Sequence, residues 1–157
     1  MFNQPSFNQQ NNNLLNDSSL NKGNLIEFCE KIQKILGKKR LSPLKEMENP
    51  ERLRLDKEGL NSEELKLAVQ WAGNLATNDF KMSSLRKIYD MFSSPQNIER
   101  IKFILAYEVG RKREFTEFGK FLEGLLNRAK SDYKKVEKIK TFLEAVIAYH
   151  KLINPKG

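Results

Sequence analysis

The chain has 157 residues, of which 39% are apolar, and a formal net charge of +8. Its one cysteine, Cys29, excludes an internal disulfide, and its one histidine, His150, excludes a metal cluster built on histidines. It has no apolar run near the roughly 20 residues of a membrane helix, and its Asn- and Gln-rich start differs from a secretory signal. We therefore expect one cytoplasmic domain of ordinary size, without a membrane segment, metal or cofactor.

The first 59 residues contain one helical pattern between two segments without one. Residues 1–23 are mostly Asn, Gln and Ser, which bury too little apolar area to offset the entropy of ordering, so a disordered tail is predicted. From 24 to 36 the apolar residues share one helical face that includes Cys29, which places the cysteine in the core. Residues 38–59 mix both charges with two prolines and are predicted to be a linker or an irregular segment.

The segment from 61 to 92 contains two predicted helices. Asn61 followed by Glu64 fits a capping box that starts a helix ending near Ala76. Ser83 can cap a second, shorter helix, which the sequence Ser93-Ser94-Pro95 ends.

Three further helices are predicted at 98–110, 115–129 and 131–153. The last of these has the longest regular pattern of apolar residues. In the 98–110 helix, Phe103 and Tyr107 widen the apolar stripe, which predicts a central and heavily buried helix.

These segments together predict an all-α fold. We expect a compact bundle of five or six helices in a single domain from 24 to 157, with short connections that favour antiparallel neighbours. A wide apolar face can be shared between copies, and the 38–59 segment is long enough for the first helices to dock elsewhere. A homodimer or an exchange of helices therefore stays open.

No catalytic group is predicted. Gly119 and Gly124 lie inside a helical pattern without a preceding strand, so they do not form a phosphate-binding loop. His150 is in line with the apolar stripe of the last helix and is expected to be a core or interface residue. Glu144 is expected to be a solvated or cap-binding carboxylate.

The positive charge of the chain is concentrated in one region. Residues 81–140 contain 15 Lys and Arg against 8 Asp and Glu, an excess of +7 out of the total of +8. Cations that flank the apolar stripes of helices leave the core toward solvent, where an anionic polymer can reach them. Three cations in a row at 111–113 exceed what one helix end requires. The lysines from 130 to 140 alternate with Asp132 and Glu137 and are expected to form an ordinary solvated face.

Three motifs resemble those of a known family. The segments at 84–89 (SLRKIY), 105–111 (LAYEVGR) and 142–151 (FLEAVIAYHK) resemble, in order and spacing, the small-subunit family of type III-A CRISPR effector complexes. The resemblance covers about residues 82–153. It implies a small, all-helical, non-catalytic protein of antiviral defence, several copies of which line a ribonucleoprotein filament beside the guide RNA and its single-stranded RNA target, together with the other effector subunits.

The resemblance also implies which residues contact RNA phosphates. Arg86 and Lys87 fall in the first motif and Arg111 in the second, and proximity adds Lys102, Lys112 and Arg113. Tyr107, Tyr149 and His150 match family positions as well, but they lie on apolar stripes and are assigned to packing. Where relatives tend to have another cation, after Lys102, this chain has Phe103 and Ile104, which argues against a contact there.

Two other functions stay open. In a helix-turn-helix DNA-binding regulator, residues 65–76 and 84–92 would form the helix pair with Arg86 and Lys87 on the recognition helix, although the 73–83 connection exceeds the usual turn of about 3–4 residues. A scaffold that binds only protein neighbours would not need Arg86, Lys87 or Arg111 for RNA binding. An enzyme has the least support, because the sequence offers no nucleophile, metal site or positioned acid-base pair.

Overall fold

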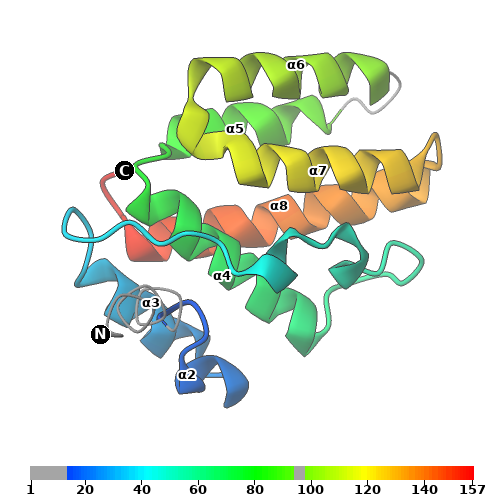
Figure 1. Cartoon of the computed structure of the whole chain (residues 1–157). Helices are drawn as coiled ribbons and strands as arrows, with labels where there is room; N and C mark the ends of the chain where they lie inside the picture. Colours follow the sequence, from blue (N-terminus) through cyan, green and yellow to red (C-terminus); the bar gives the residue numbers. More distant parts are fainter. Residues whose placement is uncertain (1–13, 94–97) are drawn as a thin grey trace, which may run out of the picture.

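The computed structural model describes residues 14–93 and 98–157, and over these ranges the chain is helical with no strand (Figure 1). This confirms the predicted all-α helical bundle. The elements in chain order are α2 (Ser18–Asn21), α3 (Leu25–Gln33), η1 (Lys45–Glu48), η2 (Pro50–Arg52), α4 (Ser62–Thr77), α5 (Met82–Met91), α6 (Ile98–Arg111), η3 (Arg113–Phe115), α7 (Thr116–Ala129) and α8 (Tyr133–Ile153). The predicted stop at Ser94 and Pro95 lies outside the described residues.

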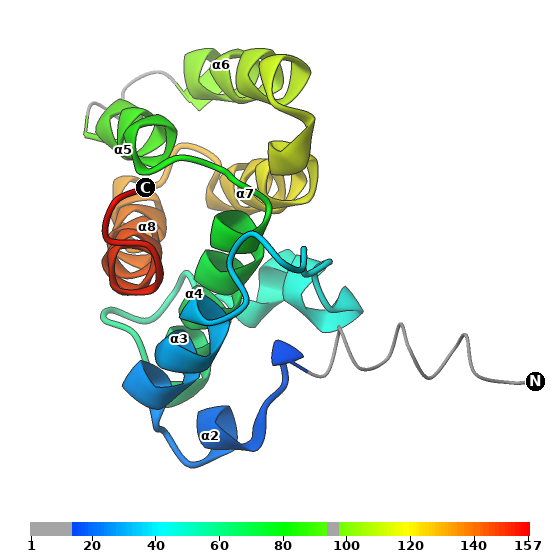
Figure 2. The same ribbon diagram turned by 90° about the vertical axis from the view of Figure 1, so that its left-hand side faces the viewer.

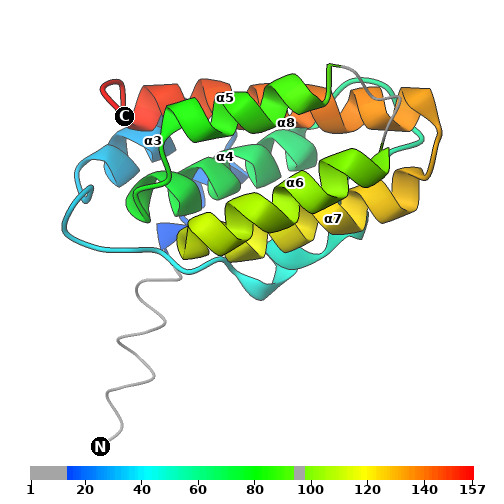
Figure 3. The ribbon, with the colours of Figure 1, turned by 90° about the horizontal axis from the view of Figure 1, so that it is seen from above.

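The bundle is organised around α4 and α8, which pack along each other, and α3 packs against both. On the side away from α3, α5 and α6 form an outer layer: α5 packs on α8 and α6 packs on α7 (Figure 2). Seen from above, α5 and α6 run in opposite directions across the bundle (Figure 3). The outer layer therefore presents two helical surfaces to solvent.

Local sequence explains how the central helices begin. Asn61 Oδ1 accepts from the backbone N–H of Glu64 at 2.8 Å, and Glu64 Oε1 accepts from that of Asn61 at 3.0 Å, which confirms the predicted capping box. Asp132 caps α8 by accepting from the backbone of Lys134 and Lys135. Both caps satisfy N–H groups that the first turn of a helix leaves without partners.

Aromatic side chains fill the space between α4 and α7. Trp71 on α4 has its ring centroid 5.0 Å from that of Phe118 and 5.4 Å from that of Phe121. Its indole Nε1 donates to the carbonyl of Met47 in η1 at 3.1 Å, so the buried polar end of the ring is satisfied. This cluster joins α4, α7 and the segment before α4 into one core.

The predicted disordered tail of residues 1–23 extends too far. Residues 1–13 lie outside the described residues, but Leu15 and Leu20 are buried in the core. Asp17 caps α2 through Ser19 and pairs with Lys31 of α3 at 2.9 Å, and Gln70 donates to the carbonyl of Leu15 at 2.8 Å. The few apolar residues in this polar segment are placed where α3 and α4 can cover them, which composition alone does not reveal.

The prediction of a linker at 38–59 is wrong in part, because this segment supplies core residues. Leu41, Met47, Leu53 and Leu55 are buried. The backbone of Leu41 is bonded to the end of α4: its N–H donates to Thr77, and its carbonyl accepts from Asn74 and Asn78. The segment is irregular in secondary structure but is packed along the bundle.

The prediction that the 98–110 helix is central and heavily buried is also wrong. Within α6 the buried residues are Ile101, Leu105 and Glu108, whereas Phe103 is 62% and Tyr107 65% exposed. The central position belongs to α4, in which every residue from 67 to 77 is buried. Periodicity identified the helix, but it could not show which of its two apolar faces meets the core.

Candidate nucleic-acid interface

Arg86 and Lys87 are positioned on the solvent side of α5. Leu85 and Ile88 turn inward toward α8, so the two residues between them point outward, and both are exposed. Within residues 14–93 and 98–157 no carboxylate lies within ion-pair distance of either cation. The structure thus presents two adjacent positive charges that the described fold does not use.

The next turn of α5 is fastened to α8. The hydroxyl of Tyr89 donates to Glu144 Oε2 at 3.4 Å, and Lys140 Nζ lies 5.5 Å from the centre of the Tyr89 ring. Glu144 is exposed, as expected of a solvated carboxylate. These contacts help to hold the helix that carries Arg86 and Lys87.

Arg111 ends α6 and is oriented by its own helix. Its Nη2 donates to Glu108 Oε1 at 3.1 Å, and its guanidinium lies 6.0 Å from the centre of the Tyr107 ring. The Glu108 side chain is 3% exposed and that of Arg111 is 42% exposed, so the ion pair lies at the edge of the core. A guanidinium has five N–H donors, and this contact uses one of them. Arg111 can therefore contact a further anion while it stays in place.

The other predicted cations are less favourably placed. Lys112 is half-buried, with its Nζ 5.9 Å from the centre of the Phe80 ring, and Arg113 is exposed in η3. Phe80 lies two residues before α5, so the residue that follows α6 lies beside the start of α5. Lys102 is half-buried and lies earlier on α6. Four of the six predicted residues therefore lie on the outer layer of α5 and α6, and Lys112 and Arg113 directly follow it, so the six do not form one compact cluster.

Two surface features were missed from the sequence. Lys38, Lys39 and Arg40 are exposed and lie beside the end of α4, where Arg40 pairs with Asp79 at 3.2 Å. The run of cations was visible in the sequence, but its neighbours were not. In addition, Tyr107 was assigned to packing, and its 65% exposure shows that this was wrong. Tyr149 is half-buried and His150 is fully buried, so packing is confirmed for His150.

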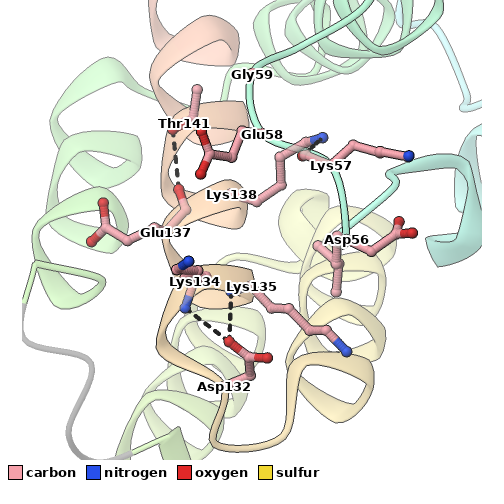
Figure 4. A pocket seen from close by; sticks show the side chains of 11 residues that line it. Asp56, Lys57, Glu58, Gly59, Asp132, Lys134, Lys135, Glu137, Lys138 and Thr141 are labelled. Carbon is pink, nitrogen blue, oxygen red and sulfur yellow. Dashed lines mark hydrogen bonds between the residues drawn. The ribbon is translucent and has the colours of Figure 1, made fainter.

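A pocket on α8 contains lysines that were expected to be solvated (Figure 4). Lys134 is exposed and Lys135 half-buried, but Lys138 is 4% exposed, so the prediction is wrong for Lys138. Lys138 Nζ lies 3.2 Å from Glu64 Oε2 and donates to the carbonyls of Arg54 and Lys57. The lining lysines are balanced by carboxylates, namely Asp56, Glu58, Asp132 and Glu137. This pocket is therefore a poorer site for an anion than the outer layer.

The one cysteine and the one histidine of the chain are placed in the core. Cys29 is fully buried, and burial raises the pKa of its thiol to about 12. His150 Nε2 lies 2.8 Å from the carbonyl of Phe80, and burial lowers the pKa of the ring. In the part of the chain that the structure describes, no group of three or more His, Cys, Asp or Glu is arranged to hold a metal ion.

None of the helices among the described residues is long and apolar enough to cross a membrane.

The fold bears on the helix-turn-helix alternative. The connection between α4 and α5 covers only residues 78–81, so its length no longer argues against such a motif. However, α5 packs on α8, and α4 is covered by α8 and α3. The two helices therefore pack on α8 and not on each other, unlike the helix pair of that motif.

The described site lies within a segment that matches a known family. A family model described as Csm2 Type III-A matches residues 60–156, which is more than half of the chain. No curated protein and no solved structure gives a significant match. The match includes α4 to α8 with all six predicted cations, and it leaves out α2, α3 and the Lys38–Arg40 run. The resemblance inferred from three motifs is confirmed.

Proposed function

This chain belongs to the Csm2 Type III-A family, the small subunits of type III-A CRISPR effector complexes, and from this we propose that it binds the guide RNA and target RNA of such a complex through their phosphates. The proposed role is non-catalytic and cytoplasmic, and it serves antiviral defence. Because contacts to phosphates position a nucleic acid without reading its bases, binding is expected to show no sequence preference.

The observation that carries this proposal is the exposure of Arg86 and Lys87 on α5. Both lie within the family match, and neither pairs with a carboxylate among the described residues. Arg111 on the neighbouring helix adds a guanidinium whose orientation is fixed by Glu108. Contacts from exposed Lys and Arg to RNA phosphates favour binding, because they release the counterions that are condensed around the phosphates.

The test is the salt dependence of RNA binding. We expect the protein to bind single-stranded RNA with a log K that falls steeply with log salt concentration. The double variant Arg86→Gln/Lys87→Gln should flatten this slope by about 1.4, because each phosphate contact to a single strand contributes about 0.7. Fluorescence anisotropy with a labelled RNA, at several salt concentrations, measures both slopes.

A matched control removes the same charge elsewhere. Lys134→Gln/Lys135→Gln takes two lysines from the charge-balanced pocket on α8, and we expect a much smaller change in slope. If log K of the unaltered protein does not change with log salt concentration, phosphate binding is contradicted. An equal change in both variants would show that only total charge matters, not the α5 surface.

The same assay separates the alternatives. Duplex DNA that competes as well as single-stranded RNA would favour the DNA-binding regulator. RNA binding and assembly that survive alanine at Arg86, Lys87 and Arg111 would favour a scaffold that contacts only the other subunits. Cleavage of the labelled RNA by the purified protein, seen on a denaturing gel, would contradict the non-catalytic role.

Self-association is part of the proposal as well. Several copies are expected in one complex, and a homodimer or an exchange of helices in the isolated protein can be measured by sedimentation over a range of concentrations. A mass that stays that of one chain at every concentration would contradict self-association in isolation.

A further inference from the structure

The outer face of α6 exposes two aromatic rings. Among the described residues the exposed large apolar side chains are Ile26, Phe103, Tyr107, Tyr133 and Leu152. Phe103 and Tyr107 are the pair in this group that lies one turn apart on a single helix, 62% and 65% exposed. The α6 helix borders the bundle, with α7 on its inner side (Figures 1 and 2). The described fold therefore leaves both rings in solvent.

Arginines lie at both ends of this aromatic pair. Residues 100, 103, 107 and 111 are separated by three or four positions, so Arg100, Phe103, Tyr107 and Arg111 share one face of α6. The Arg111 guanidinium lies over the Tyr107 ring at 6.0 Å. The face thus alternates between cations and aromatic rings along the helix axis.

Small residues surround the two rings on the surface of α6. Ala106 and Gly110 are exposed, and a Cβ atom added at Gly110 would meet nothing within 4 Å. Small residues next to the rings leave space beside them for a planar group, while the Arg111 guanidinium lies over one side of the Tyr107 ring. Aromatic rings in a protein core are covered by other side chains, whereas these two rings are exposed and have space beside them.

The surrounding charge favours an anionic ligand over a second copy of the chain. Arg111 and Arg113 are exposed near one end of this face, and Arg100 lies at the other end. Of the two carboxylates of α6, Glu108 is buried and paired with Arg111, and Glu99 is exposed four positions before Phe103, so cations outnumber exposed carboxylates around the rings. Two copies meeting through this face would bring like charges together. A single-stranded nucleic acid supplies both complements, negative phosphates for the arginines and flat bases for the rings.

We propose that Phe103 and Tyr107 form a stacking platform for unpaired bases of single-stranded RNA. This inference rests on the proposed RNA-binding function and specifies a contact to bases beside the phosphate contacts. It assigns a role to the position after Lys102, where the motif comparison argued against a contact because a cation is absent. Stacking tolerates any base, since every base has an aromatic face, so it agrees with binding that shows no sequence preference.

The test compares RNA with and without bases. The double variant Phe103→Leu/Tyr107→Leu keeps apolar side chains and the helix but removes the rings. We expect its Kd for single-stranded RNA to rise at least about fivefold, the lower end of what one stacked base contributes. Its Kd for an abasic ribose-phosphate strand of the same length should stay unchanged, and so should the salt slope, because no charge is removed.

The matched control is Tyr133→Leu, which removes an equally exposed tyrosine, 62% exposed, from the start of α8. We expect it to leave both Kd values unchanged. The fluorescence of Trp71 during denaturant unfolding checks that all variants remain folded. An RNA labelled with 2-aminopurine adds a direct signal, since stacking quenches its fluorescence and the leucine variant should relieve the quenching.

Each outcome decides between the two claims. Suppose that RNA binding by the unaltered protein weakens steeply with salt, and that the leucine variant binds RNA equally well. This result overturns the stacking platform and leaves phosphate binding in place. An equal loss on RNA and on the abasic strand also overturns stacking. If the leucine variant binds RNA normally but no longer associates with the other effector subunits, the face belongs to a protein partner. Unaltered protein that binds neither polymer overturns the proposed function together with the inference.

Discussion

Glu64 and Lys138 form a buried ion pair in which every polar atom has a partner. Each side chain is 3% exposed. Glu64 accepts from the backbone N–H groups of Arg54 and Asn61, and the three donors of Lys138 meet Glu64 and the carbonyls of Arg54 and Lys57. Because burial removes both charges from water, the pair is sensitive to the loss of either partner.

We expect Glu64→Gln and Lys138→Met each to lower the free energy of unfolding by about 3–5 kcal/mol, since each leaves a buried charge without its partner. The double variant should lose less than the sum of the two. Denaturant unfolding followed by Trp71 fluorescence measures all three. As a control, Asp79→Asn breaks the exposed Arg40 pair and should cost no more than about 1 kcal/mol. Additive losses would contradict direct coupling of Glu64 and Lys138.

At the level of elements, glycine allows the 38–59 segment to approach α7. A Cβ atom at Gly124 would lie 2.6 Å from Cγ of Pro50, whose ring cannot rotate away from its own backbone. Arg128 fastens the same contact by donating to the carbonyls of Pro50 and Leu53. The glycine costs helix stability in α7, and in return η2 lies directly on the helix.

Gly124→Ala therefore has two opposed effects. Alanine improves helix propensity by about 1 kcal/mol, but the clash with Pro50 costs about 1–3 kcal/mol, so we expect a net loss of stability. Gly110→Ala on α6, where the added Cβ meets nothing within 4 Å, should instead gain about 1 kcal/mol. Thermal unfolding followed by circular dichroism compares the two. A gain at both positions would show that η2 moves away without cost.

The helices could be predicted from sequence because their signals are local. The Asn61–Glu64 box and the apolar spacing of α8 need only residues a few positions apart. Burial depends on distant partners, so it was predicted less well: Leu41 is held by Asn74 and Asn78, and Lys138 by Glu64. For the candidate site, the exposure of Arg86 and Lys87 followed from their buried neighbours, whereas the exposure of Phe103 and Tyr107 depended on which face of α6 meets α7.

For the whole molecule, one histidine determines how stability changes near neutral pH. His150 on α8 is fully buried, and its Nε2–H donates to the carbonyl of Phe80 at 2.8 Å. Its Nδ1 has no partner among the described residues. Burial lowers the pKa of the ring below its usual 6.5. Just below pH 6.5 the ring therefore stays neutral in the folded chain, whereas it binds a proton in the unfolded chain.

The sign of the effect follows from this difference. The neutral His150 ring contributes to the free energy of unfolding fully above about pH 6.5. This contribution is lost as the pH falls below about 6.5, by at most about 1.4 kcal/mol per pH unit. Denaturant unfolding at pH 7.5 and 5.5 should show the loss. In His150→Gln it should largely vanish, because the chain has no other histidine. A protein whose stability is equal at both pH values would contradict a neutral buried ring.

A second loss of stability is expected in stronger acid. The pKa of Asp17 is lowered to about 2 by hydrogen bonds from Ser19 and Lys31. The ionised Asp17 contributes to the free energy of unfolding above about pH 4, and this contribution disappears as the pH falls toward 2. The pH range of this loss is well separated from that of the loss at His150. The two steps concern opposite ends of the chain, α2 and α8.

The arrangement of α5 and α6 as an outer layer has a consequence for how this protein can change over time. These helices reach the core through few side chains, and their solvent faces contribute little to folding. Substitutions on those faces can alter what the protein binds at little cost to its stability, while the buried faces of α4 and α8 tolerate few changes. Recognition and stability are thus open to selection separately, on different helices of one small bundle.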